Sequence, residues 1–179
     1  MKLKEVFLIP TGDELASGIV IDTDSPMIIQ KILKEEPNCR CVRLPVTPDD
    51  RDALAQRIRE SAQQGADLII IIGGSGSGHL HSELLGEDYT GETMESVLDK
   101  YTDTALYGKN GHMWSRLVCG RTGKALTVNV PGPNAEAAAV TEALLAHLDD
   151  TCEIINKEMA DALRHCYDKS SMGRSDGDV

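Results

Sequence analysis

Short apolar segments alternate with longer amphipathic segments through the first half of the chain. Residues 4–9 and 68–72 are short runs dominated by apolar residues, as in buried strands, and we expect a further strand at 39–44. Residues 25–35 and 49–64 carry apolar residues at three- and four-residue spacing, as one face of a helix does. This alternation of strand and helix predicts a largely parallel sheet.

Polar and turn-forming residues mark the ends of the two expected helices. Asp24 or Ser25 can cap the first helix. Pro48 and Asp49 are expected to start the second, and Gly65 to end it.

The second half of the chain has a less regular pattern. The expected elements are, in order, a helix at 92–101, strands at 114–118 and 125–130 joined by a hairpin-like turn at 120–123, and helices at 135–148 and 150–166. The sequence predicts one domain over residues 1–168, a three-layer α/β sandwich around a mostly parallel sheet. The polar tail, 169–179, is expected to be disordered.

The composition bears on both the core and the binding partners of the protein. Of 179 residues 41% are hydrophobic but only 3% aromatic, so the core must consist mainly of aliphatic side chains. The net charge of −11 argues against nucleic acid or an anionic membrane as the main partner. An anionic ligand would have to be held by local positive potential, which backbone amides can supply.

Five cysteines without framework spacing predict reduced thiols in a cytoplasmic protein. Cys39 and Cys41 are expected on one face of a strand, where a redox or metal role is the less favoured alternative. No hydrophobic signal segment or transmembrane run is evident, which also favours the cytoplasm.

The strongest candidate for ligand binding is a glycine- and serine-rich loop after the strand at 68–72. A side-chain-poor loop at the end of a buried parallel strand lets backbone N–H groups approach an anion, although a flexible connection is the alternative. No lysine follows as in a Walker loop, and the loop follows the third strand rather than the first, unlike the dinucleotide fingerprint. The candidate residues are Gly73, Gly74, Ser75, Gly76, Ser77 and Gly78.

Two histidines and a glutamate follow this loop. His79, His81 and Glu83 would project to one side of an extended segment. They could bind a metal, form a polar lip beside a ligand, or lie on a solvated surface.

Two further loops follow strands and can meet the glycine-rich loop at one edge of the sheet. The first contains Thr11, Gly12, Asp13 and Glu14. The carboxylates of Asp13 and Glu14 could hold Mg²⁺, or the segment could be a turn with a solvated acidic pair. The other contains Pro131, Gly132 and Asn134, and Asn134 can cap the helix that follows. That loop could present a helix N-terminus to an anion or serve only as a rigid turn.

Together these loops resemble the molybdopterin-binding domain family of molybdenum-cofactor biosynthesis. Residues 11–15, with Gly18 and 22–24, resemble its first motif, 73–78 its central Gly-Gly motif, and 130–133 its Leu-Pro-Gly motif. The chain departs from the family pattern at Asp24, where Asn is usual, at Pro133-Asn134, where Asn-Pro is usual, and at His81, where Asp is usual.

The resemblance implies a homo-oligomer, trimer or dimer, that binds the phosphate of molybdopterin at the glycine-rich loop. It leaves open whether the chain is an enzyme; nucleotidyl or molybdenum transfer would use Asp13, Glu14, His81 and Glu83, with Mg²⁺ at Asp13 and Glu14. One alternative is a metal-dependent nucleotide-pyrophosphate hydrolase of the competence-associated type. Another is a binding or assembly protein without catalysis, which His81 in place of the acid favours.

Overall fold

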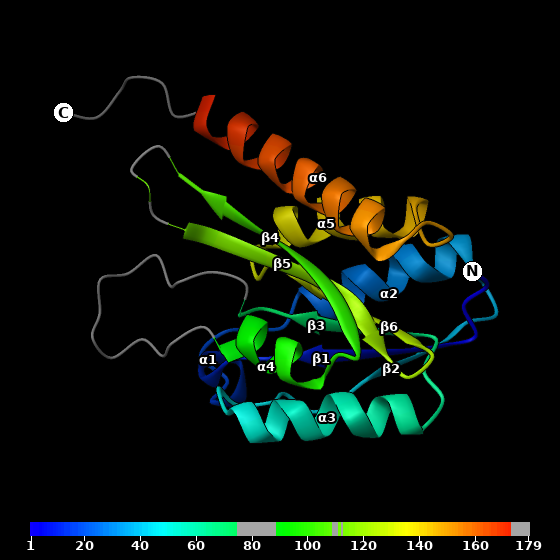
Figure 1. The fold of residues 1–179 in the computed structure, drawn as a ribbon. Helices are drawn as coiled ribbons and strands as arrows, with labels where there is room; N and C mark the ends of the chain where they lie inside the picture. The colour runs from blue at the N-terminus through cyan, green and yellow to red at the C-terminus, as the bar shows by residue number, and fades with distance from the viewer. Residues whose placement is uncertain (75–88, 109–110, 112, 173–179) are drawn as a thin grey trace.

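One six-stranded sheet lies between two layers of helices in the computed structural model, which describes residues 1–74, 89–108, 111 and 113–172 (Figure 1). The elements are β1 (Glu5–Pro10), α1 (Asp13–Ala16), α2 (Asp24–Glu35), β2 (Arg40–Arg43), α3 (Arg51–Gln63), β3 (Leu68–Ile72), α4 (Tyr89–Val97), β4 (Lys100–Tyr107), β5 (Met113–Thr122), β6 (Ala125–Val130), α5 (Asn134–Ala146) and α6 (Cys152–Met172). The strand order is β2-β1-β3-β6-β5-β4. The predicted α/β sandwich is therefore confirmed.

The sheet has a parallel part and an antiparallel extension. β2, β1, β3 and β6 run parallel, while β5 is antiparallel to β6 and β4 antiparallel to β5. Ile70 of β3 aligns with Leu8 on one side and Val128 on the other. β3 is therefore an inner strand, bonded along its length to both neighbours.

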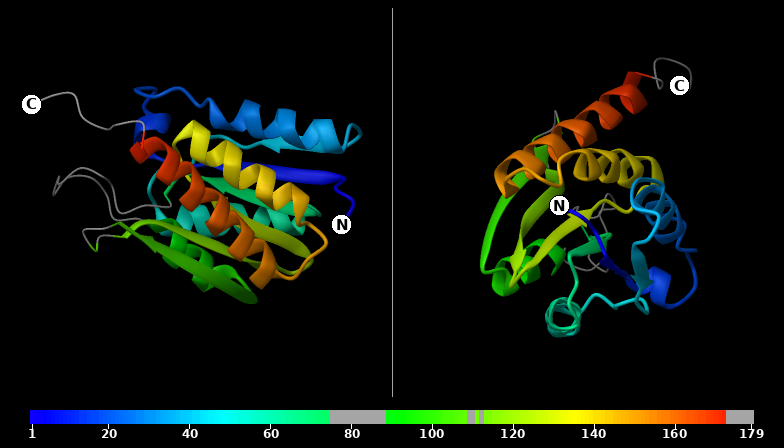
Figure 2. Two further views of the ribbon diagram at one scale, coloured as in Figure 1. Left: turned by 90° about the horizontal axis from the view of Figure 1, so that it is seen from above. Right: turned by 90° about the vertical axis from the view of Figure 1, so that its right-hand side faces the viewer.

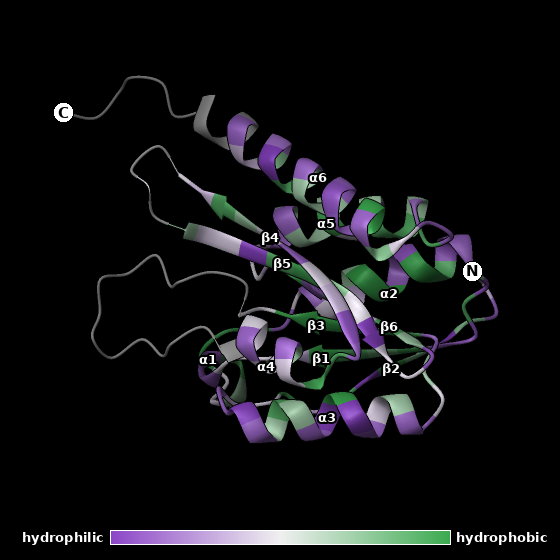
Figure 3. Ribbon diagram, in the orientation of Figure 1, coloured by the Kyte–Doolittle hydropathy of each residue, from purple (hydrophilic) through white to green (hydrophobic). Residues whose placement is uncertain are grey.

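Alternate residues of the inner strands enter two separate cores. Leu8 and Ile70 belong to the cluster that includes side chains of α2, α5 and α6, whereas Phe7, Ile69 and Ile71 belong to the cluster that includes side chains of α3 and α4. Figure 2 shows these two groups of helices on opposite faces of the sheet. Each of these five side chains is at most 1% exposed. The inner strands are accordingly apolar, while α3 shows a polar outer face (Figure 3).

The connections between strands place a crevice at the end of β3. The connections that follow β1 and β6 lead to α2 and α5 on one face, whereas the helix after β3, α4, lies with α3 on the other face. In open α/β sheets, ligands bind where neighbouring connections leave on opposite faces. The carboxyl end of β3 has such a reversal on each side.

The predicted cap of the first helix and the predicted start of the second both differ from the structure. Asp22, not Asp24 or Ser25, accepts hydrogen bonds from the first backbone N–H groups of α2. α3 begins at Arg51 rather than at Pro48 and Asp49, and Asp50 caps it by accepting a hydrogen bond from the N–H of Ala53 at 2.8 Å. Gly65, with a φ of +98°, follows α3 as predicted.

The predicted helix at 92–101 was partly wrong. α4 ends at Val97, and Lys100 begins β4, an outer strand that the sequence analysis missed. The predicted hairpin is present, but β5 continues through Thr122, which pairs with Ala125. The turn therefore contains two residues rather than four.

The last two helices also differ at their ends. α5 begins at Asn134 itself, with Pro133 at the capping position and no side-chain cap, so the predicted capping role of Asn134 is wrong. α6 continues to Met172, and residues 173–179 lie outside the described part. Among the described helices, α6 included, none is long and apolar enough to cross a membrane.

A buried asparagine joins β6 to β5 where their regular pairing ends. The last paired residues are Cys119 and Val128. Beyond them Asn129, fully buried, accepts a hydrogen bond from the N–H of Val118 at 2.6 Å and donates one to the carbonyl of Arg116 at 2.9 Å. Its carboxamide thus replaces a missing backbone partner just before the loop that follows β6.

We expect Asn129→Ala to lower the free energy of unfolding by about 2–4 kcal/mol, because two buried backbone groups lose their partner. Asn38→Ala is the matched control, since Asn38 is exposed, and its effect should stay within about 0.5 kcal/mol. Urea unfolding measures both. Equal midpoints for the two variants would contradict the bridging role.

Candidate functional site

Three loops meet at the carboxyl ends of β1, β3 and β6. The N–H of Thr11 donates to the carbonyl of Ile72 at 2.9 Å, and that of Gly73 donates to Val130 at 3.0 Å. The Thr11 hydroxyl also donates to Ile72, at 3.0 Å. The sheet ladder therefore continues one residue into the loops, which confirms that they converge.

The loop of residues 44–50 joins this arrangement. Gly12 N–H donates to the carbonyl of Thr47 at 3.1 Å, and Thr47 N–H donates to Pro10 at 2.9 Å. The Thr47 hydroxyl is buried and has no hydrogen-bond partner among the described residues. No pattern in the sequence marks Thr47, because its position depends on the neighbouring loop.

Two predicted glycines have backbone conformations that other residues rarely adopt. Gly12 has a φ of +126° and Gly73 a φ of +94°. A Cβ on Gly73 would also lie 3.1 Å from the Thr11 hydroxyl oxygen and 3.2 Å from the Thr11 carbonyl oxygen. Glycine at 73 is thus required both by conformation and by close packing.

Asp13 and Glu14 form the start of α1, beside a third carboxylate that the sequence analysis did not assign to the site. The N–H of Asp49 donates to Oδ1 of Asp13 at 3.2 Å. Asp49 is exposed, but its pKa is raised, because partial desolvation and the charges of Asp13 and Glu14 disfavour its ionised form. Negative charge therefore collects at the mouth of the loops.

The described carboxylates do not complete a metal site. Among described residues, no group of three His, Cys, Asp or Glu side chains is arranged to hold a metal ion. A hard cation at Asp13 and Glu14 would need further oxygen ligands from water or from a bound phosphate.

The N-terminus of α2 is already occupied by a side chain. Asp22 accepts hydrogen bonds from the N–H groups of Ser25, at 2.9 Å, and Asp24, at 3.2 Å, and from Nε of Arg43 at 2.8 Å. Burial alone would raise the pKa of Asp22, but the hydrogen bonds from Ser25 and Arg43 lower it. This helix end is therefore satisfied internally and does not need an external anion.

Asn134 connects the first and third predicted motifs. Its Nδ2 donates to Oδ1 of Asp24 at 2.7 Å and lies 3.3 Å from the Thr23 carbonyl oxygen. Asp24 is 8% exposed, and its pKa is raised by that burial although the bond from Asn134 lowers it. Asp24 and Asn134 both lie where the chain departs from the family pattern, and the hydrogen bond shows that these two departures are in contact.

The remaining predicted residues fall in two groups. Pro131 is buried at the end of β6, whereas Gly132 is exposed and has open space where a Cβ would be. The predicted residues outside the described part of the chain are Ser75, Gly76, Ser77, Gly78, His79, His81 and Glu83.

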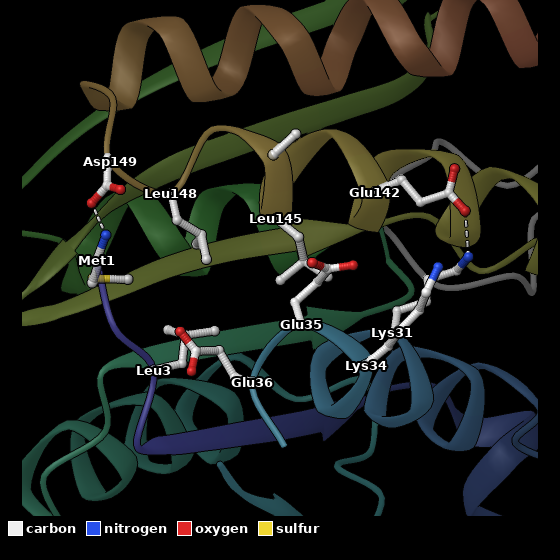
Figure 4. A pocket seen from close by; sticks show the side chains of 11 residues that line it. Met1, Leu3, Lys31, Lys34, Glu35, Glu36, Glu142, Leu145, Leu148 and Asp149 are labelled. Atoms are coloured by element: carbon white, nitrogen blue, oxygen red, sulfur yellow. Dashed lines mark hydrogen bonds and ion pairs between the residues drawn. The ribbon is translucent and has the colours of Figure 1, made fainter. Parts of the chain in front are cut away.

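A separate hollow of about 530 Å³ lies between α2, α5 and the N-terminal segment (Figure 4). Lys31 and Glu142 form an ion pair across it at 2.5 Å, and the Met1 amino group pairs with Asp149. No predicted site residue lines it. Two of its cations are thus engaged by carboxylates of the hollow itself, so we place the candidate site at the loops instead.

The chain matches the model of a family described as "Probable molybdopterin binding domain" over residues 7–150. It is 39% identical over 74 residues to a CinA-like protein of Thermosipho melanesiensis, covering 41% of this chain and 18% of that protein. A CinA-like protein of Anaeromyxobacter is 34% identical over 94 residues, which cover 52% of this chain and 21% of that protein. The matched regions thus span about a fifth of those relatives.

Solved structures share the fold. The molybdopterin biosynthesis enzyme MoaB of Thermus thermophilus superposes with a TM-score of 0.60 at 23% identity, covering 90% of this chain and 97% of that one. The protein CinA of Thermoplasma acidophilum superposes with a TM-score of 0.61 at 16% identity, covering 82% and 98%. At these identities the likeness establishes the architecture alone.

We expect Gly73→Ala to lower the free energy of unfolding by about 2 kcal/mol or more, because strain and the contact with Thr11 add together. Gly123→Ala is the matched control: its φ is +59°, but nothing lies within 4 Å of the added Cβ. The free energy of unfolding of Gly123→Ala should fall by only about 1 kcal/mol. Chemical unfolding of both variants is the measurement, and equal losses would contradict close packing at Gly73.

The raised pKa of Asp49 means that the folded state binds its proton more readily than the unfolded state does, so its ionisation opposes folding at neutral pH. We expect Asp49→Asn to stabilise the folded state by roughly a few tenths of a kcal/mol at pH 7. The effect is small because solvent screens the charges. The gain should shrink as the pH falls through the raised pKa.

Asp52→Asn provides the control for this charge change. Asp52 lies in the first turn of α3, where negative charge is favourable, so its removal should slightly destabilise. Thermal unfolding between pH 4 and 7 compares the two variants. A stability loss for Asp49→Asn at pH 7 would refute charge repulsion at this loop.

Proposed function

Because the chain belongs to the molybdopterin-binding domain family, we propose that it binds the phosphate of molybdopterin, or of a related pterin, at the carboxyl end of β3. The observation that carries this proposal is the joining of three loops by the hydrogen bonds of Thr11 to Ile72 and Gly73 to Val130. Glycines at 12 and 73 keep side chains away from the backbone there. A fixed, side-chain-poor backbone is suited to close contact with an anion.

Backbone amides would supply the positive potential that an acidic chain needs. The N–H groups of residues 74–78 are the candidates for binding phosphate, and Thr11 and Gly12 would form the adjoining wall. Nearby guanidinium groups are engaged elsewhere, since Arg43 pairs with Asp22 and Arg51 with Glu92. Pro131, Gly132 and Asn134 would close the third side of the pocket.

Asp13 and Glu14 would contact either a divalent cation or the hydrogen-bond donors of the pterin ring. With Asp49 they offer hard oxygen atoms, which suit Mg²⁺, and the remaining ligands would be water and phosphate oxygens. If the protein is an enzyme, nucleotidyl or molybdenum transfer fits best, with the chain positioning the reactants. His81 and Glu83 are the candidates for contacts from the following segment.

A second candidate function is hydrolysis of a nucleotide pyrophosphate. The resemblance of the first loop to the competence-associated domain is the basis for this candidate, and the CinA-like relatives are 34–39% identical to this chain within the matched regions. Asp13, Glu14 and Glu83 would then hold the metal ion. A third candidate is ligand binding without catalysis, which His81 at the position of the family's acid favours. We further propose a homo-oligomer, trimer or dimer, which light scattering can measure.

Calorimetry with molybdopterin under anaerobic conditions tests the binding proposal. We expect Asp13→Asn to weaken binding about tenfold in the presence of Mg²⁺ and by much less in its absence, because the carboxylate acts through the cation. Asp52→Asn removes one charge from the exposed start of α3 and should leave affinity unchanged. Absence of binding by the intact protein would refute the proposal.

Incubation with ADP-ribose and Mg²⁺ separates the alternatives. Product formation that Asp13→Ala abolishes would support the hydrolase, and product that survives this change would exclude Asp13 from the reaction. Activity that appears only in His81→Asp would support the binding protein without catalysis. The same assay on Asp52→Asn controls for the loss of charge.

A further inference from the structure

Two thiols meet at the edge of the sheet opposite the candidate site. Cys119 lies on β5 and is fully buried, whereas Cys152 is the first residue of α6 and is partly exposed. Cys152 packs against the core cluster that contains Cys119, and the interaction between the two thiols raises the pKa of Cys119 strongly and lowers that of Cys152. A buried thiol from a strand and an accessible thiol from a helix therefore form one pair.

Cys152 opens into a small pocket of about 240 Å³. Lys100 and Tyr101 at the start of β4 and Arg121 near the end of β5 line one side of it. The other side is lined by Asp150 and Thr151, which precede α6, and by Cys152 and Glu153, which begin it. Arg121 aligns with Leu126 near the start of β6, whereas the candidate site follows Val130 at its end. The pocket is thus separate from the glycine-rich loop.

The surroundings of Cys152 favour its thiolate. Its pKa is lowered, chiefly because the Cys119 thiol donates a hydrogen bond, and also because Arg121 and Lys100 are close; burial and Glu153 act in the opposite direction. The other acid, Asp150, is engaged by Nδ1 of His147 at 2.7 Å. A position at the start of a 21-residue helix adds further positive potential.

We propose that Cys152 and Cys119 form a thiol oxidation site for small hydroperoxides, with Cys152 as the attacking thiolate and Cys119 as the resolving thiol. Cys152 Sγ attacks the terminal peroxide oxygen, the O–O bond breaks, and the alkoxide or hydroxide that leaves takes a proton from water. Sulfur is oxidised to a sulfenic acid and the peroxide is reduced.

The second step joins the strand to the helix. Sγ of Cys119 attacks the sulfenic sulfur, the S–S bond forms and the S–O bond breaks. The hydroxide that leaves takes the Cys119 proton as water. Overall, two thiols and one hydroperoxide give one disulfide, one alcohol or water, and one further water molecule. Because Cys119 is buried in the core cluster against which Cys152 packs, intramolecular closure competes well with any reaction between molecules.

Treatment of the reduced full chain with equimolar hydrogen peroxide at pH 7, followed by alkylation and peptide mass spectrometry, tests the site. We expect the Cys119–Cys152 disulfide to form before any other cysteine product. Cys119→Ser should stop at a sulfenic acid on Cys152 that dimedone traps, and Cys152→Ser should leave Cys119 reduced. A first product that contains Cys39 or Cys41, or that joins two molecules, would overturn the proposal.

Cys166 is an internal control, because it lies on the same helix and is also partly buried. Iodoacetamide should alkylate Cys152 at least about tenfold faster than Cys166 at pH 7. Lys100→Gln should lower the alkylation rate of Cys152 about twofold, because it removes a positive charge from the pocket. Lys157→Gln removes a positive charge elsewhere on α6 and should leave that rate unchanged. Equal rates at the two cysteines would overturn the assignment of Cys152 as the attacking thiolate.

Discussion

The pairing of β3 with strands on both sides is the constraint on which the rest of the structure depends. All five residues of β3 are at most 1% exposed, and each aligns with a residue of β6 and of β1. A shift of one residue would exchange the side chains of the two cores, so the register is strongly specified. The carboxyl end of β3 is therefore fixed by packing. The hydrogen bond from the Gly73 N–H to the carbonyl of Val130 holds the first residue of the loop in place as well.

The features that sequence could predict are those that local composition determines. An uninterrupted apolar run indicates burial on both faces, and glycines at the ends of strands indicate close approach of backbones. Both properties belong to the segment itself, so β3 and the loops at Gly12 and Gly73 could be located before the structure was known.

The features that sequence could not predict depend on distant partners. β4 is an outer strand with several polar residues, and only pairing with β5 distinguishes it from a continuation of α4. Asp22 is fixed partly by Arg43, and Asn129 acts because β5 and β6 diverge beyond Cys119. Asp49 joins the candidate site only because the loop of Thr47 pairs with that of Thr11. None of these contacts leaves a periodic signal.

The acidic groups near the loops divide into two kinds, and this division limits what can bind there. Asp22 and Asp24 are used within the fold, the first at the start of α2 and the second by Asn134. Asp13, Glu14 and Asp49 remain at the mouth, where the raised pKa of Asp49 reflects partial desolvation and repulsion from the other two carboxylates. Uncompensated, these carboxylates would repel a phosphate that the backbone amides attract. An anionic ligand can therefore be bound tightly only if a cation lies between the carboxylates and the phosphate, or if uncharged donors of the ligand face the carboxylates.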